Sequence, residues 1–119
     1  MQSVTINLPY PPSVNHYWRH VDGKTLISKE GRIYRDDVAL MLHLHRVPKF
    51  SGSLSVHVDA HPPDARRRDI DNILKALLDA LQYGGAYHDD NQIERLSVAR
   101  QSVTAKGKVC VTIEERSRG

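Results

Sequence analysis

The stretch RRRDIDNILKALLDALQYGG, residues 66–85, decides the fold because it joins a charged entry to the most regular apolar pattern in the chain. Its apolar residues recur at i, i+3, i+4 and i+7, the spacing that places side chains on one face of an α-helix. Gly84 and Gly85 follow and are typical of a helix end. The sequence therefore predicts an amphipathic helix whose apolar face is formed by Ile70, Ile73, Leu74, Leu77, Leu78 and Leu81.

The segments before this helix predict two strands and a second helix. Residues 4–8 and 54–60 alternate apolar and polar side chains, as half-buried strands do, and prolines end both segments. Residues 13–27 contain no such pattern and are expected to form a long loop. The second helix follows this loop; it is expected to begin after Ser28, a suitable N-cap, and to end before Pro48. Its apolar face is predicted to contain Ile33, Tyr34, Val38, Met41, Leu42 and His45.

The tail, residues 93–115, predicts two further strands joined near residues 105–107. The element order β-loop-α-β-α-β-β indicates an α/β (α+β) fold with a mixed β-sheet and two main helices. A chain of 119 residues has room for one core, so a single domain spanning residues 1–119 is expected.

Composition excludes several classes of protein. The chain has 39% hydrophobic and 26% charged residues, near the globular average, and a formal net charge of +3. One cysteine, Cys110, cannot form an internal disulfide, and no stretch is long and apolar enough for a membrane span. A cytoplasmic protein without membrane contact is expected. No motif for a nucleotide, an organic cofactor or a nucleophilic serine is present.

Asp69 and Asp71 are the first candidate functional residues. Either one alone is explained as a cap on the helix that follows. Two carboxylates at i, i+2 after three arginines exceed what capping requires. Lys75 follows Asp71 by one turn, which fits an ordinary surface ion pair or a lysine that stabilises charge developing on phosphorus. The spacing leaves both open.

Asp89 and Asp90 form a second acidic pair after the glycine turn. Asp-Asp-Asn is ordinary turn chemistry, yet a tight turn also brings the chain back along the helix. If Asp90 meets Asp69 and Asp71, three carboxylates with water are suitable ligands for Mg²⁺, with Mn²⁺ as an alternative.

Four motifs in this order resemble the RusA-type Holliday junction resolvases, small homodimeric endonucleases of bacteria and their phages. They are LPYPPSVN (residues 8–15), YRD (34–36), PDARRRDIDNILK (63–75) and DDNQ (89–92). The resemblance implies that Asp69, Asp71 and Asp90 bind the metal and that Lys75 is the active-site lysine. It places Arg68 in the motif needed for DNA handling and leaves Asp89 as a structural candidate.

The resemblance also implies an activity and partners. The expected enzyme is an Mg²⁺-dependent endodeoxyribonuclease that resolves four-way DNA junctions by paired symmetrical nicks in recombination and repair, and that acts as a homodimer. Alternatives are a non-catalytic DNA-binding module and a nuclease acting on flaps, forks or RNA.

Tyr17, Trp18 and Tyr87 are candidates for stacking on opened bases or for ordinary packing. Expected phosphate contacts are Arg66, Arg67 and Arg68, with Arg19, Lys24 and Lys29 as weaker candidates.

Overall fold

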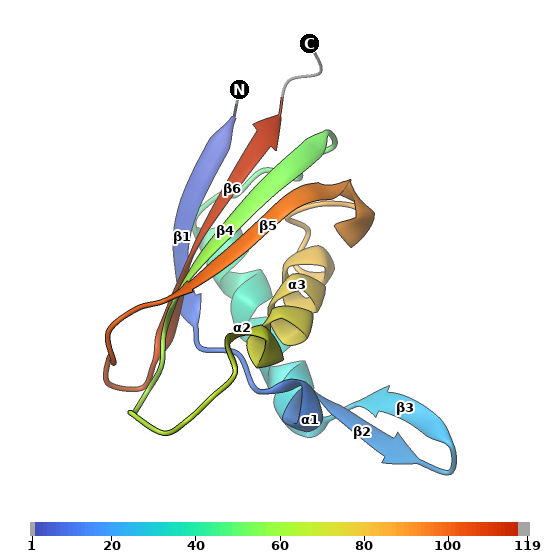
Figure 1. The fold of residues 1–119 in the computed structure, drawn as a ribbon. Helices are drawn as coiled ribbons and strands as arrows, with labels where there is room; N and C mark the ends of the chain where they lie inside the picture. Colours follow the sequence, from blue (N-terminus) through green and yellow to red (C-terminus); the bar gives the residue numbers. More distant parts are fainter. Residues whose placement is uncertain (1, 117–119) are drawn as a thin grey trace.

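A computed structural model describes residues 2–116; Met1 and residues 117–119 of the expected domain lie outside the described residues. A four-stranded sheet carries the two main helices, α2 and α3, on one face, and a short hairpin projects from the body (Figure 1). The predicted α+β class, with a mixed sheet and two main helices, is confirmed. Within residues 2–116 no helix is long and apolar enough to cross a membrane. The sheet consists of β1 (Ser3–Pro9), β4 (Ser53–His61), β5 (Ile93–Arg100) and β6 (Lys108–Arg116).

The strand order β1-β6-β4-β5 explains where α3 lies. β6 is antiparallel to both β1 and β4, whereas β4 and β5 are parallel. Parallel neighbours require a crossover connection, and the segment after β4 supplies it as a 3₁₀ turn, η1 (Ile70–Ile73), followed by α3 (Leu74–Tyr83). The two strands predicted in the tail are present, but they are not neighbours because β4 lies between them.

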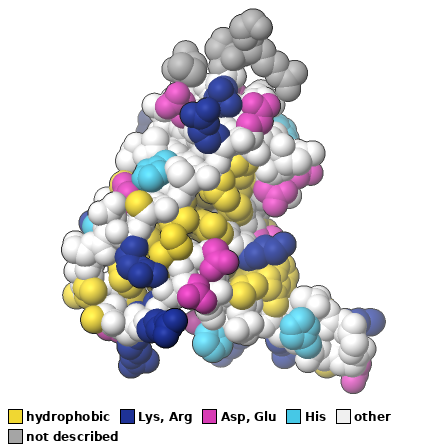
Figure 2. All heavy atoms as spheres, in the orientation of Figure 1, with side chains coloured by type: hydrophobic (Ala, Val, Ile, Leu, Met, Phe, Trp, Pro, Cys, Tyr) yellow, Lys and Arg dark blue, Asp and Glu magenta, His cyan; other side chains and the backbone are white. Residues whose placement is uncertain are grey.

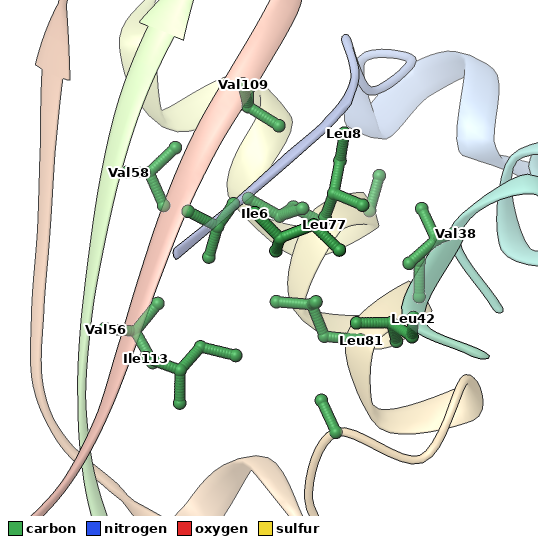
Figure 3. Close-up of a cluster of buried hydrophobic side chains, with 14 of the residues drawn as sticks. Ile6, Leu8, Val38, Leu42, Val56, Val58, Leu77, Leu81, Val109 and Ile113 are labelled. Atoms are coloured by element: carbon green, nitrogen blue, oxygen red, sulfur yellow. The ribbon is translucent and has the colours of Figure 1, made fainter. Parts of the chain in front are cut away.

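The core lies between the sheet and the two helices, where side chains from β1, β4 and β6 meet those of α2 and α3 (Figure 3). The predicted face of α3 is correct at Ile73, Leu77 and Leu81, which are buried. Ile70 is exposed instead, because the regular α-helix begins only at Leu74 and the preceding turn is 3₁₀.

Helix α2 (Lys29–Leu44) begins as predicted, since the Ser28 side chain accepts a hydrogen bond from the Gly31 amide at 2.9 Å. Tyr34, Val38 and Leu42 face the core. The prediction was wrong for Ile33, which is 53% exposed, and for His45, which lies beyond the helix end. Ile33 precedes Tyr34 by one residue, and about 100° of helical rotation separates their side chains.

The prediction of a long loop over residues 13–27 was wrong. The segment forms a one-turn helix, α1 (Val14–Tyr17), and a hairpin of β2 (Trp18–Val21) and β3 (Lys24–Ile27). Asp22 and Gly23 connect the strands with φ of 50° and 75°. Asp-Gly with positive φ at both residues is the preferred two-residue hairpin turn, so the signal was present in the sequence.

Candidate active site

Lys75 and Asp90 line the same pocket beside α3. The pocket has a volume of about 290 Å³, and its other lining residues are Trp18, Leu74, Leu78, Asp79 and Gln82. Lys75, Asp79 and Gln82 follow one another at helical spacing, so one face of α3 forms one wall.

The glycine turn brings Asp90 to this wall of the pocket. The Gly84 amide donates to the Ala80 carbonyl at 2.9 Å and closes α3. Gly85 then adopts a φ of 90°, a conformation that favours glycine. The chain returns along the helix, and the Asp90 amide donates to Gln82 Oε1 at 3.2 Å. Lys75 and Asp90 therefore reach the same pocket from the two sides of the turn.

Asp89, the first aspartate of this pair, has a structural role. Its carboxylate accepts from the Asn91 amide at 3.0 Å, and its own amide donates to the Gln92 side chain at 3.0 Å. These reciprocal bonds form a capping box on η2 (Asp90–Gln92). The capping box orients the turn that carries Asp90.

Asp69 and Asp71 lie at the start of η1. Asp69 occupies the N-cap position, but its side chain makes no capping hydrogen bond. Both side chains are exposed, and neither carboxylate accepts a hydrogen bond from another side chain within residues 2–116. Capping therefore does not account for Asp69. Asp69 also lines a second pocket of about 270 Å³, whose other residues include Tyr10, His16, Arg68 and Asn72.

The described chain does not assemble the three carboxylates into a closed metal site. Within residues 2–116, no three Asp, Glu, His or Cys side chains lie close enough together to hold an ion. Asp90 lines the pocket that contains Lys75, whereas Asp69 lines a separate pocket with Tyr10 and Arg68. The carboxylates nevertheless fit Mg²⁺, because this ion is usually held by one or two carboxylates, several waters and substrate phosphates.

The three arginines of the motif differ in how strongly neighbouring residues hold their side chains. Arg68 Nη1 lies 2.6 Å from Asp64 Oδ1, and Arg100 donates to the Arg68 carbonyl. The Arg68 side chain is 28% exposed, against 84% for Arg66. Hydrogen bonds from the Arg68 side chain and the Arg66 amide lower the pKa of Asp64 to about 2. Arg68 therefore fixes the loop before Asp69, and Arg66 and Arg67 extend into solvent.

The weaker cationic candidates gather around the hairpin. Arg19 and Lys24 are exposed on it, and Lys29 is exposed where α2 begins. The hairpin and the loop after β4 lie at the same end of the molecule as the start of α3 (Figure 1). Basic, acidic and apolar side chains lie side by side over the start of α3 (Figure 2).

The three aromatic candidates for base stacking differ in how deeply they are buried. Tyr17 and Tyr87 are fully buried, so both have packing roles. Trp18 is half-buried and lines the pocket with Lys75 and Asp90. Of the three aromatic candidates, Trp18 alone reaches a surface that a ligand can contact.

The family Endodeoxyribonuclease RusA matches residues 9–114 of the chain. The chain belongs to the RusA endodeoxyribonuclease family. Three relatives are each 40% identical to this RusA-family chain over 116 residues, which cover 97% of both chains. They are crossover junction endodeoxyribonucleases RusA of Escherichia coli strain K12, Enterobacteria phage 82 and Shigella sonnei strain Ss046.

Sequence reasoning missed the second carboxylate of the pocket in this RusA-family protein. Asp79 lies one helical turn after Lys75 and shares the pocket with Asp90. The i, i+4 spacing between Lys75 and Asp79 was a usable signal. Its partners, Tyr17 and Arg35, were not evident because they are 62 and 44 residues away in the sequence.

Proposed function

We propose that the protein is a structure-selective endodeoxyribonuclease that resolves four-way DNA junctions by paired symmetrical nicks in recombination and repair. The observation that carries the proposal is the pocket shared by Lys75 and Asp90 in a member of the RusA family. The relatives from Escherichia coli and Enterobacteria phage 82 are crossover junction endodeoxyribonucleases, which supports a DNA junction as the substrate. The carboxylates of Asp69 and Asp71, which accept no side-chain hydrogen bond within residues 2–116, lie just before α3 and support hydrolytic chemistry over DNA binding alone.

Each residue has a role in phosphodiester hydrolysis. Asp69, Asp71 and Asp90 would hold Mg²⁺, or Mn²⁺, together with a DNA phosphate. When bound, this ion would supply Lewis-acid polarisation of the scissile phosphate and a more acidic water. Lys75 is free of any ion pair within residues 2–116, so its ammonium group is available to neutralise charge developing on the phosphate oxygens.

Two groups of cations would hold the DNA backbone. Arg66 and Arg67 extend from the loop before Asp69. Arg19 and Lys24 lie on the hairpin, and Lys29 lies at the start of α2. Contacts of this kind fix the register of a duplex without reading its sequence. Arg68, already bonded to Asp64, contributes chiefly by shaping the loop.

Paired nicks on a junction require two equivalent sites, which a C2 homodimer supplies. Apolar side chains at Ile33, Leu40 and Leu44 are exposed along one side of α2 and support an interface there. We infer a cytoplasmic location, because the proposed substrate is cellular or phage DNA.

The test compares labelled DNA substrates: a four-way junction, a duplex, a fork, a flap and a single strand, each with Mg²⁺ or with EDTA. We expect symmetrical nicks in the junction that disappear with EDTA while junction binding persists. Equal cutting of forks, flaps or RNA would favour the broader nuclease. Junction binding without cleavage at any Mg²⁺ or Mn²⁺ concentration would favour the non-catalytic module.

Asp71→Asn separates catalysis from binding. We expect cleavage to fall by a factor of at least about 100, because a metal-held carboxylate is lost, with junction affinity equal or higher because repulsion from phosphate is reduced. Cleavage is followed by gel assay and affinity by fluorescence anisotropy. Glu114→Gln, at an exposed carboxylate on β6, is the matched control and should resemble the wild type.

A further inference from the structure

Asp79 stands in the wall of the candidate active site without a role in the proposed chemistry. It lies on α3 one turn after Lys75 and lines the same pocket as Lys75, Asp90 and Trp18. Its side chain is 31% exposed, so the carboxylate is in partial contact with solvent.

Two side chains from other elements bind the same oxygen of Asp79. Tyr17 donates its hydroxyl hydrogen to Asp79 Oδ2, and Arg35 Nε donates to that atom at 3.2 Å. The Arg35 guanidinium lies 4.4 Å from the centre of the Tyr83 ring, which restricts its movement. Asp79 thus joins α3 to both α1 and α2. Within residues 2–116, Asp79 Oδ1 has no side-chain hydrogen-bond donor.

Tyr17 is the point from which the hairpin leaves the body. Its ring is fully buried, and its carbonyl accepts from the Ser28 amide at 2.9 Å, which closes the base of the hairpin. Gly31 packs so tightly on this carbonyl that an added Cβ would lie 2.5 Å from it. Trp18 follows and contacts the Tyr17 ring edge to face, with centroids 4.9 Å apart. The position of Tyr17 therefore sets the position of the hairpin and of Trp18.

We propose that Asp79 is a positioning residue that fixes the β2–β3 hairpin relative to Lys75 and Asp90, so that a DNA strand held by the hairpin enters the pocket in one register. This inference rests on the proposed function, because it assumes that the pocket cuts DNA. Burial and the hydrogen bond to Asp79 raise the pKa of Tyr17, so the phenol stays protonated and remains a donor at neutral pH.

The test uses Asp79→Asn and Tyr17→Phe in the full chain. Tyr17→Phe keeps the buried ring and removes only the donor, so it remains informative if Asp79→Asn folds poorly. With junction DNA at saturation, we expect the single-turnover rate to fall roughly 10- to 100-fold, since misplacement of about 1 Å has this effect. We also expect nicks to spread over neighbouring phosphodiesters, with little change in Kd. Glu94→Gln, which removes a surface carboxylate 3.5 Å from Arg116, is the matched control and should cut as the wild type does.

A second readout does not depend on cleavage. Trp18 is the only tryptophan, so acrylamide quenching of its fluorescence reports on the hairpin base directly. We expect faster quenching in both variants than in the wild type and in Glu94→Gln. Unchanged quenching together with unchanged nick positions would overturn the inference. A fall in cleavage rate that matches the loss of folded protein, measured by circular dichroism, would also overturn it. If quenching changes but wild-type protein cuts no DNA, the proposed function fails while the anchoring role of Asp79 stands.

Discussion

At the scale of single residues, the Asp64–Arg68 ion pair separates two kinds of cation in one motif. Arg68 donates to the Asp64 side chain and backbone, and Arg100 holds the Arg68 carbonyl from β5. Arg66 Nε lies 3.7 Å from Asp64 Oδ2, but its side chain is 84% exposed, and Arg67 is exposed with no ion pair within residues 2–116. A row of three identical side chains therefore contains one residue that shapes the loop and two exposed residues that can meet phosphate.

The pKa of Asp64 tests this arrangement. We expect its carboxyl to titrate near pH 2 in the folded protein, below the ordinary 3.8, because the Arg68 side chain and the Arg66 amide stabilise the charged form. A lowered folded pKa means that the stabilisation is complete above pH 3.8 and is lost as the pH falls through about 2. NMR titration of the side-chain carboxyl measures it. Arg68→Ala should return the midpoint toward 3.8, and an unshifted wild-type midpoint would contradict the pairing.

The salt dependence of DNA binding tests whether Arg67 contacts phosphate while Arg68 mainly shapes the loop. Each lost phosphate contact reduces the slope of log K against log salt by about 0.9. We expect Arg67→Gln to produce this change while cleavage at saturating DNA is retained. Arg68→Gln should change the slope less and lower cleavage more, because it loosens the loop before Asp69. Anisotropy titrations at several salt concentrations measure the slopes, and equal behaviour of the two variants would refute the division.

At the scale of elements, the start of α2 organises the base of the hairpin. Ser28 accepts from the Gly31 amide, and its hydroxyl lies 2.9 Å from the Tyr17 carbonyl. One residue therefore caps a helix and holds the end of α1. The helix cap and the hairpin base depend on the same side chain.

Ser28→Ala should destabilise the protein by about 1 kcal/mol, the usual loss for a helix N-cap. The urea midpoint should fall with little change in the slope of unfolding free energy against urea, since the folded and unfolded surfaces stay similar. Ser3→Ala, at an exposed serine in β1, is the control and should leave the midpoint in place. A loss no larger than that of the control would show that the cap contributes little.

At the scale of the whole molecule, one face of the sheet is covered by helices, and three apolar side chains of α2 remain exposed. Ile33, Leu40 and Leu44 are separated by seven and four residues, so they share one side of the helix. The proposed activity needs two sites at a fixed distance. A second copy on this surface would cover the apolar residues and supply the second site.

Sedimentation velocity tests the dimer. We expect the wild type at about 27 kDa, twice the 13.5 kDa of the chain, and Leu40→Glu shifted toward the monomer because a buried interface would have to accept a charge. Val103→Glu, at a residue that is exposed outside α2, is the matched control and should remain dimeric. A wild type that sediments as a monomer would exclude the homodimer, and an unaffected Leu40→Glu would exclude this surface.

The sequence by itself determined the elements whose signals are local. These signals are the apolar period of α3, the Ser28 cap, the alternation in β1, β4 and β6, and the glycine turn after α3. Each depends on neighbours within a few residues. The motif order also identified the family. The Asp-Gly turn belongs to this group, because its local signal was present although a loop was predicted.

Tertiary structure alone decided the features that join distant residues. The position of β4 between β5 and β6 depends on pairing across the sheet, which no local pattern specifies. The exposure of Ile33 and the ion pair that holds Arg68 depend on which surface each side chain meets. The bonds from Tyr17 and Arg35 to Asp79 close long loops in the chain, and packing of α1, α2 and α3 against one another determines that these three residues meet.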